Sequence, residues 1–238
     1  MGGVAVGSFA NFLENMSWES LLDTLFTVVA ALLCLTVHEL CHGAAAYRLG
    51  DPTAKNAGRL TLNPIRHIDP LGLILMITAH VGWAKPVPVD PRYFKEPKKG
   101  MALTALAGPV SNFLLAWAFL LVANGATWLA GRLDWSVTPE WVAWGLVYLF
   151  EFLINAAVLS VGLGIFNLFP IPPLDGSKVL FSVLPDQAYI TLLRYERFGM
   201  LLMLAAVWLG WLDRPLTYLI THAVNILARL SFFPYPIF

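Results

Sequence analysis

Long runs of residues without charge constrain the fold of this chain more than any other feature. Residues 100–131 contain no Asp, Glu, Lys or Arg, residues 24–37 contain none either, and residues 141–174 contain only Glu151. A helix needs about 20 apolar residues to cross the hydrocarbon core of a bilayer. The sequence therefore predicts membrane-spanning helices at roughly 22–48, 102–130 and 142–169 within an all-α, polytopic helical bundle.

Composition supports a membrane protein and argues against most soluble classes. Charged residues make up 13% of the chain, about half of their usual share in a soluble domain. The 15 Lys and Arg residues balance the 15 Asp and Glu residues, so no basic excess would attract nucleic acid. Cys34 and Cys41 are seven positions apart on one predicted helix, about 10 Å and too far for a disulfide, so we expect free, buried thiols.

We interpret the chain as one membrane-embedded domain over residues 1–238 with its core at about 22–185, because no internal repeat or long polar linker divides it. The apolar segment 71–84 is too short to span a bilayer and lies between Asp69-Pro70 and Lys85-Pro86. We expect it to form a re-entrant or interfacial hairpin, and a few short β-strands are compatible with it. The apolar runs 198–212 and 216–230 form either a hairpin in the membrane or one span followed by an interfacial helix.

Lys and Arg residues predict the orientation. Twelve of the fifteen lie in the stretches 48–66, 85–99 and 178–197. These stretches lie on one side if segment 71–84 does not cross, and positive residues mark the cytoplasmic side. We therefore expect a multi-pass protein of the cell membrane with its N-terminus outside.

The first predicted span contains the motif His-Glu-x-x-His, from His38 to His42. Residues four apart share a helix face, so both imidazoles can reach one metal ion. Glu39 lies about 100° around the helix from His38, where it can accept a proton from water without binding the metal. Ionisable groups inside a span are costly and point to a function, although two structural histidines satisfied by neighbouring groups would fit the same spacing.

Asp175 is the candidate for a third ligand. It follows Pro170, Pro172 and Pro173, which break the third predicted span. A carboxylate there would partly balance the charge of a divalent ion, but Asp is also a good N-cap for a helix that starts at Gly176. The spacing alone leaves both interpretations open.

Together these residues resemble the site-2 protease family of intramembrane zinc metalloproteases, peptidase family M50, in a short form without a PDZ or CBS domain. The resemblance covers roughly residues 30–185. Its motifs occur in the family's order, at residues 38–43, 49–51, 62–72, 82–89, 107–112 and 167–176.

The resemblance implies one Zn²⁺ per chain, held by His38, His42 and Asp175, with Glu39 as the catalytic base. It places Asn167 near the active site, where it could hold substrate backbone or a developing oxyanion. It also implies that the substrate is a transmembrane protein cleaved within or beside its span. With the positive stretches in the cytoplasm, the active site would lie near the cytoplasmic side.

Several interpretations remain open beside this one. His67 and Asp69 could line a water path or touch substrate, or they could serve local turn structure. The extended segments near 58–62 and 86–90 could pair with an unwound substrate strand. A non-proteolytic relative that binds partners and an intramembrane metal or ion transporter are the alternative functions, and a homo-oligomer is compatible with the sequence.

Overall fold

The computed structural model describes residues 18–79, 84–185, 187, 196–232 and 237. Three long helices form its centre: α2 (Trp18–Arg48), α5 (Pro97–Ala130) and α6 (Glu140–Asn167). All three are long and apolar enough to cross a membrane. The three predicted spans are therefore confirmed, although each helix begins two to five residues before the predicted start.

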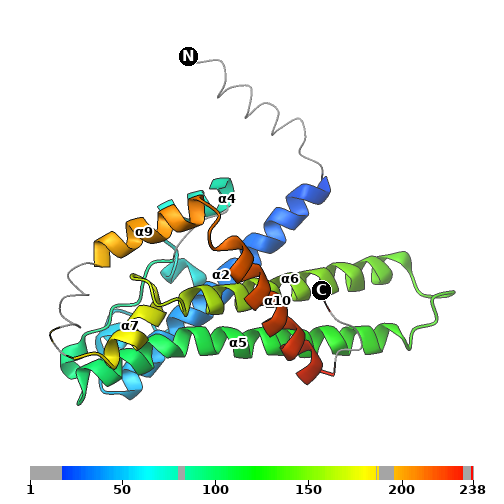
Figure 1. The fold of residues 1–238 in the computed structure, drawn as a ribbon. Coiled ribbons are helices and arrows are strands. Elements are labelled where there is room, and N and C mark those ends of the chain that lie inside the picture. The colour runs from blue at the N-terminus through cyan, green and yellow to red at the C-terminus, as the bar shows by residue number, and fades with distance from the viewer. Residues whose placement is uncertain (1–17, 80–83, 186, 188–195, 233–236, 238) are drawn as a thin grey trace.

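The three long helices pack against one another (Figure 1). The core between α5 and α6 contains small side chains, among them Ala116 and Ala157, which let helix backbones approach closely. Leu120, Val161 and Ile165 fill the rest of this core. Within the described part of the chain there is no β-sheet, and the fold is all-α as predicted.

The chain direction brings several helix ends together at one end of the bundle. The C-terminal half of α2, the N-terminal half of α5, the end of α6 and the short helix α7 (Asp175–Ser182) gather there (Figure 1). Lys98 at the start of α5 donates a hydrogen bond to the carbonyl of Leu184, just after α7, over 2.7 Å. We call this region the site end of the bundle.

Four short elements connect α2 to α5: α3 (Thr53–Asn56), η1 (Pro64–Arg66), α4 (Pro70–Ala79) and η2 (Pro91–Tyr93). The ten residues of α4 extend about 15 Å, half of what a bilayer core requires. Ile68 and Ala84 form an antiparallel backbone bridge, so the two ends of the segment between them lie side by side. These paired ends agree with the expected hairpin, of which residues 80–83 lie outside the described part of the chain.

In the described part of the chain, α7 is followed by α9 (Glu196–Trp208) and α10 (Asp213–Leu230). Helix α10 lies across α6 and α5 (Figure 1) and buries Val224 and Ala228 in their core. Neither α9 nor α10 is among the helices long and apolar enough to cross a membrane. The C-terminal span expected from the sequence thus stays a prediction.

Candidate metal centre

His38, His42 and Asp175 meet at the site end of the bundle. One turn of α2 separates the two histidines, and their Nε2 atoms lie 2.9 Å apart. The Oδ2 atom of Asp175, the first residue of α7, lies 3.2 Å from Nε2 of His38 and 3.0 Å from Nε2 of His42. All three side chains are buried. The structure therefore brings together the three predicted ligands from two elements far apart in the sequence.

Asp175 reaches the histidines because the chain turns sharply after α6. Helix α6 ends at Asn167 and α7 begins at Asp175, with irregular backbone between them. Gly176 lies so close to this backbone that a Cβ there would be 2.1 Å from the carbonyl oxygen of Leu168. Only glycine fits such an approach, which explains why Asp-Gly stands at the start of α7. Asp175 is thus both the first residue of a helix and a partner of the histidines.

The remaining ring nitrogens of both histidines bind acceptors on α5. Nδ1 of His42 lies 2.7 Å from the carbonyl oxygen of Thr104, and Nδ1 of His38 lies 3.2 Å from Oδ1 of Asn112. Asn112 is oriented by its own amide nitrogen, which donates to the carbonyl of Ser160 on α6 over 3.3 Å. A carbonyl oxygen can only accept a hydrogen bond, so both Nδ1 atoms carry the proton.

This arrangement fits a bound metal cation. With Nδ1 protonated, each neutral imidazole presents a lone pair on Nε2, and the two lone pairs converge on the Asp175 carboxylate. Three acceptor atoms so close together repel one another unless a cation lies between them. Their separations of 2.9–3.2 Å are near the roughly 3.3 Å between neighbouring nitrogen or oxygen ligands in a tetrahedral zinc site. Two imidazoles and one carboxylate are also a ligand set found in catalytic zinc sites.

The charge at this site favours an ionised Asp175. When protons rather than a metal ion lie between these atoms, burial would raise the pKa of its carboxyl group, but hydrogen bonds from Nε2 of His38 and His42 outweigh burial and hold the pKa well below its ordinary value. The ammonium group of Lys178, 3.3 Å from Oδ1, acts in the same direction. An ionised carboxylate is the form that binds a cation.

Gly108 on α5 leaves the space that the two imidazoles occupy. A Cβ at this position would lie 2.5 Å from Cε1 and Nε2 of His42 and 2.6 Å from Cε1 of His38. Any larger residue would therefore displace both rings. The spacing of the histidines does not reveal their contacts with Gly108, Thr104 and Asn112. The signals in the sequence are the motif at 107–112 and an amide inside a charge-free span.

Glu39 is held beside the site by the extended segment after the hairpin. Its Oε2 accepts a hydrogen bond from the backbone N–H of Val87 over 2.8 Å. The side chain of Val87 faces α2, because a Cβ on Gly43 would lie 3.1 Å from its Cγ1. Glu39 is half-buried and is not part of the three-residue cluster. Glu39 thus lies next to His38 in the sequence but outside the cluster, and its role as the base stays a prediction.

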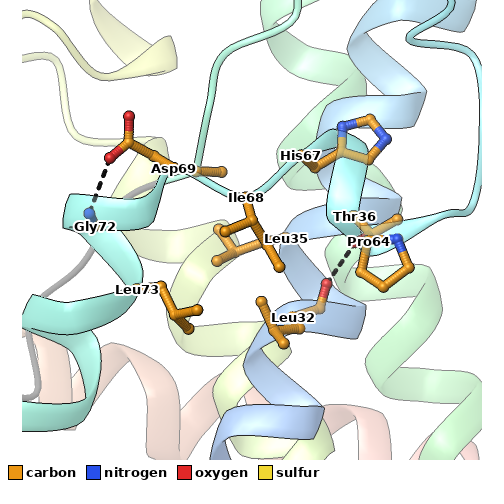
Figure 2. A pocket seen from close by; sticks show the side chains of 10 residues that line it. Leu32, Leu35, Thr36, Pro64, His67, Ile68, Asp69, Gly72 and Leu73 are labelled. Carbon is orange, nitrogen blue, oxygen red and sulfur yellow. Dashed lines mark hydrogen bonds between the residues drawn. The ribbon is translucent and has the colours of Figure 1, made fainter.

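His67 and Asp69 lie at the edge of a small apolar pocket between α2 and α4. Figure 2 shows Leu35 and Leu73 in this pocket, while the ring of His67 points away from them. Oδ1 of Asp69 accepts hydrogen bonds from the N–H groups of Leu71 and Gly72 at the start of α4, which is local turn structure. The buried His67 contacts the carbonyl of Thr61 through Nε2 over 2.9 Å. No contact of either residue with the metal cluster is found in the described chain.

Asn167 and Cys41 are not joined to the cluster. Asn167 is the last residue of α6, and its amide nitrogen donates to the carbonyl of Leu163 in the same helix over 3.0 Å. Its predicted contact with substrate stays a prediction. Cys34 and Cys41 are free thiols as predicted; Cys34 is buried, but the predicted burial of Cys41 is wrong, because its side chain is only half-buried.

Comparison with known proteins relates the whole bundle to a protease family. The sequence model of peptidase family M50 matches residues 26–209 of the chain. YwhC of Bacillus subtilis, named as a candidate zinc metalloprotease, is 40% identical over 181 residues that cover 75% of this chain and 78% of YwhC.

Two further relatives carry the name Rip2 and are also named as candidate zinc metalloproteases. Rip2 of Mycolicibacterium smegmatis is 29% identical over 220 residues, which cover 90% of this chain and 77% of the relative. Rip2 of Mycobacterium tuberculosis is 31% identical over 224 residues, which cover 89% of this chain and 80% of the relative. No solved structure matches the chain.

Proposed function

Because this chain belongs to peptidase family M50, we propose that it is an intramembrane zinc metalloprotease of the site-2 protease type. Its reaction is the hydrolysis of a peptide bond within or beside the transmembrane segment of another protein. One observation supports this proposal most directly. The buried side chains of His38, His42 and Asp175 meet, with Glu39 next to His38 in the sequence, at one end of a bundle whose long helices could cross a membrane. The names of the relatives support the same activity.

The three clustered side chains hold the metal in this proposal. Zn²⁺ held by these side chains would supply Lewis-acid chemistry, since it would polarise the scissile carbonyl and make the attacking water more acidic. The chain contributes the orientation of the ligands, because Thr104 and Asn112 fix the ring planes of the two histidines. Burial between α2, α5 and α7 excludes bulk water and strengthens the electrostatic contacts in the site.

Glu39 acts as the general base and then as the general acid. It accepts a proton from the attacking water and returns it to the leaving amine. The hydrogen bond from Val87 leaves the second carboxylate oxygen of Glu39 for this proton transfer. Asn167, at the end of α6, is the candidate for holding substrate backbone or the developing oxyanion.

The bilayer supplies the setting of the reaction. The Lys and Arg residues near the site end suggest that this end faces the cytoplasm and that the N-terminus lies outside. A substrate helix must unwind before attack, because its carbonyl groups are already hydrogen-bonded. The extended segments near 58–62 and 86–90 are candidates for pairing with the unwound strand.

Replacement of Glu39 by Gln tests the proposal. The amide keeps the size of the side chain and an oxygen for the Val87 N–H, but it cannot take up a proton. We expect zinc content to be unchanged and cleavage of a model single-span protein to fall by about 10²- to 10⁴-fold. Glu151→Gln, the same change at an exposed position of α6, serves as the matched control and should cleave normally.

The outcomes separate the alternatives. Near-normal cleavage by Glu39→Gln would exclude Glu39 as the base. A wild-type protein that binds zinc but cleaves no substrate would favour a non-proteolytic relative. Zinc uptake into vesicles that contain the wild-type protein would favour a metal transporter.

A further inference from the structure

A groove with a cationic lining lies on the outer face of the extended segment that contacts Glu39. The loop after α3 and the segment at 85–88 form its two walls. Arg59, Arg66 and Lys85 provide its charged groups, and Ile65, Pro86 and Pro88 provide much of its apolar surface. The residues that line the groove include no Asp or Glu. Its charge is therefore complementary to an anion.

Arg59 is the most unusual of the three cations because it is 7% exposed. One of its terminal nitrogens donates to the carbonyl of Lys85, but its buried Nε has no hydrogen-bond partner in the described chain. Buried polar groups are almost always hydrogen-bonded, and an unpartnered N–H of a guanidinium is costly. A carboxylate in the groove would balance the charge of this guanidinium group.

The groove and the catalytic region share one stretch of backbone, which contacts both of them. Successive residues of an extended chain point to opposite faces. Val87 faces α2 and donates its N–H to Glu39, whereas Pro86 and Pro88 line the groove on the other face. A single extended segment thus separates the groove from Glu39.

Hydrogen bonds at both ends hold this segment in place. The N–H of Lys85 donates to the carbonyl of His67 over 2.8 Å, and the N–H of Asp90 donates to Oδ2 of the fully buried Asp51 over 2.7 Å. The wall of the groove is consequently fixed before any ligand binds. A preformed site loses little conformational entropy on binding, so its charges can contribute to selectivity.

We propose that this groove binds an acidic side chain of the substrate, next to the bond that is cleaved. The proposal rests on the proposed proteolytic function and adds a substrate preference for Asp or Glu flanking the transmembrane segment. A substrate side chain fits the groove better than a lipid headgroup, since the groove wall is the segment that also holds Glu39. A site for a lipid headgroup would not need to share a backbone segment with the catalytic base.

Binding to a full-length chain that carries Glu39→Gln tests the groove without turnover. The probes are labelled single-span peptides whose residues beside the span are Glu, Gln or Lys, measured by fluorescence anisotropy in vesicles of phosphatidylcholine alone. We expect the Glu peptide to bind about tenfold more tightly than the Gln peptide, the order for one carboxylate beside two exposed cations and one buried cation. Equal affinities would overturn the proposal.

Charge reversal in the groove locates the effect. Arg66→Glu combined with Lys85→Glu should shift the preference to the Lys peptide. The matched control, Lys95→Glu with Lys99→Glu, makes the same change in net charge at exposed positions outside the groove and should keep the preference for Glu. If the control variant loses the preference to the same extent, the preference comes from the overall charge of the protein and not from the groove. That result would refute the proposal.

Two further measurements distinguish binding of an acidic substrate side chain from binding of a lipid and from proteolysis itself. A preference for Glu that disappears when phosphatidylglycerol is added would show that an anionic lipid occupies the groove and would overturn the proposal. Cleavage of the Gln peptide by wild type but not by Glu39→Gln would support the proteolytic function whatever the charge preference. The two proposals can therefore fail separately.

Discussion

Replacement of Gly108 by Ala is the sharpest test of the way α5 supports the metal site. The new Cβ would lie 2.5 Å from two ring atoms of His42 and 2.6 Å from one of His38, whereas ordinary contacts begin near 3.4 Å. Both rings would have to retreat by about 1 Å, and overpacking of this kind typically costs about 1–3 kcal/mol. Without metal the imidazoles can rotate away, so we expect the cost to fall on the metal-bound form.

That free energy predicts a loss of zinc affinity of about 5- to 150-fold. Zinc affinity is measured by competition with a chelator of known affinity, and circular dichroism checks that the helix content is unchanged. Gly125→Ala is the matched control, because it lies in the same helix and a Cβ there meets no atom within 4 Å. If Gly108→Ala and Gly125→Ala both bind zinc like the wild type, the inferred packing of α5 against the histidines is wrong.

Three further predictions concern the ligands and the topology. Asp175→Asn should lose zinc under mild chelation that leaves the wild type loaded, because an amide oxygen carries no charge; unchanged retention would remove Asp175 from the ligand set. Asn112→Leu should weaken zinc binding by about 10- to 100-fold, since Nδ1 of its partner histidine loses its acceptor, and normal affinity in the same chelator assay would contradict this. Cysteines at Lys55 and Lys95, placed in a background without native cysteines, should respond alike to an impermeant thiol reagent; labelling of only one from outside intact cells would rule out the hairpin.

The long helices could be predicted from sequence because the bilayer itself sets their length. Twenty or more residues with at most one charge among them have few alternatives to a membrane-spanning helix, and α2, α5 and α6 all contain such runs, with Glu39 in α2 and Glu151 in α6 as the single charges. Their first turns could not be predicted by this rule. Helix α5 begins at Pro97 and includes two lysines before the charge-free run, because a helix can continue into the polar interface where charge is tolerated.

The site was predictable only where its geometry is local. His38 and His42 share a helix face by spacing alone, whereas Asp175 joins them across 137 positions of the chain. The spacing of the prolines is equally compatible with Asp175 as a metal ligand and as a helix cap, and Asp175 is indeed the first residue of α7. A contact of such long range depends on the packing of α5 between α2 and α7, which no local pattern encodes.

The register of α5 against α2 is the feature that unites these observations. Thr104, Gly108 and Asn112 are spaced by four residues and therefore form one stripe on α5. The two helices run in opposite directions, so Thr104 receives His42, Asn112 receives His38, and Gly108 lies against both. A shift of one residue would turn this stripe by about 100° and replace it with Ala105, Pro109 and Phe113. Phe113 has no side-chain acceptor for His38, and the ring of Pro109 would occupy the space that Gly108 leaves for the imidazoles. The packing of two membrane-spanning helices thus determines whether the histidines have the orientation to bind a metal.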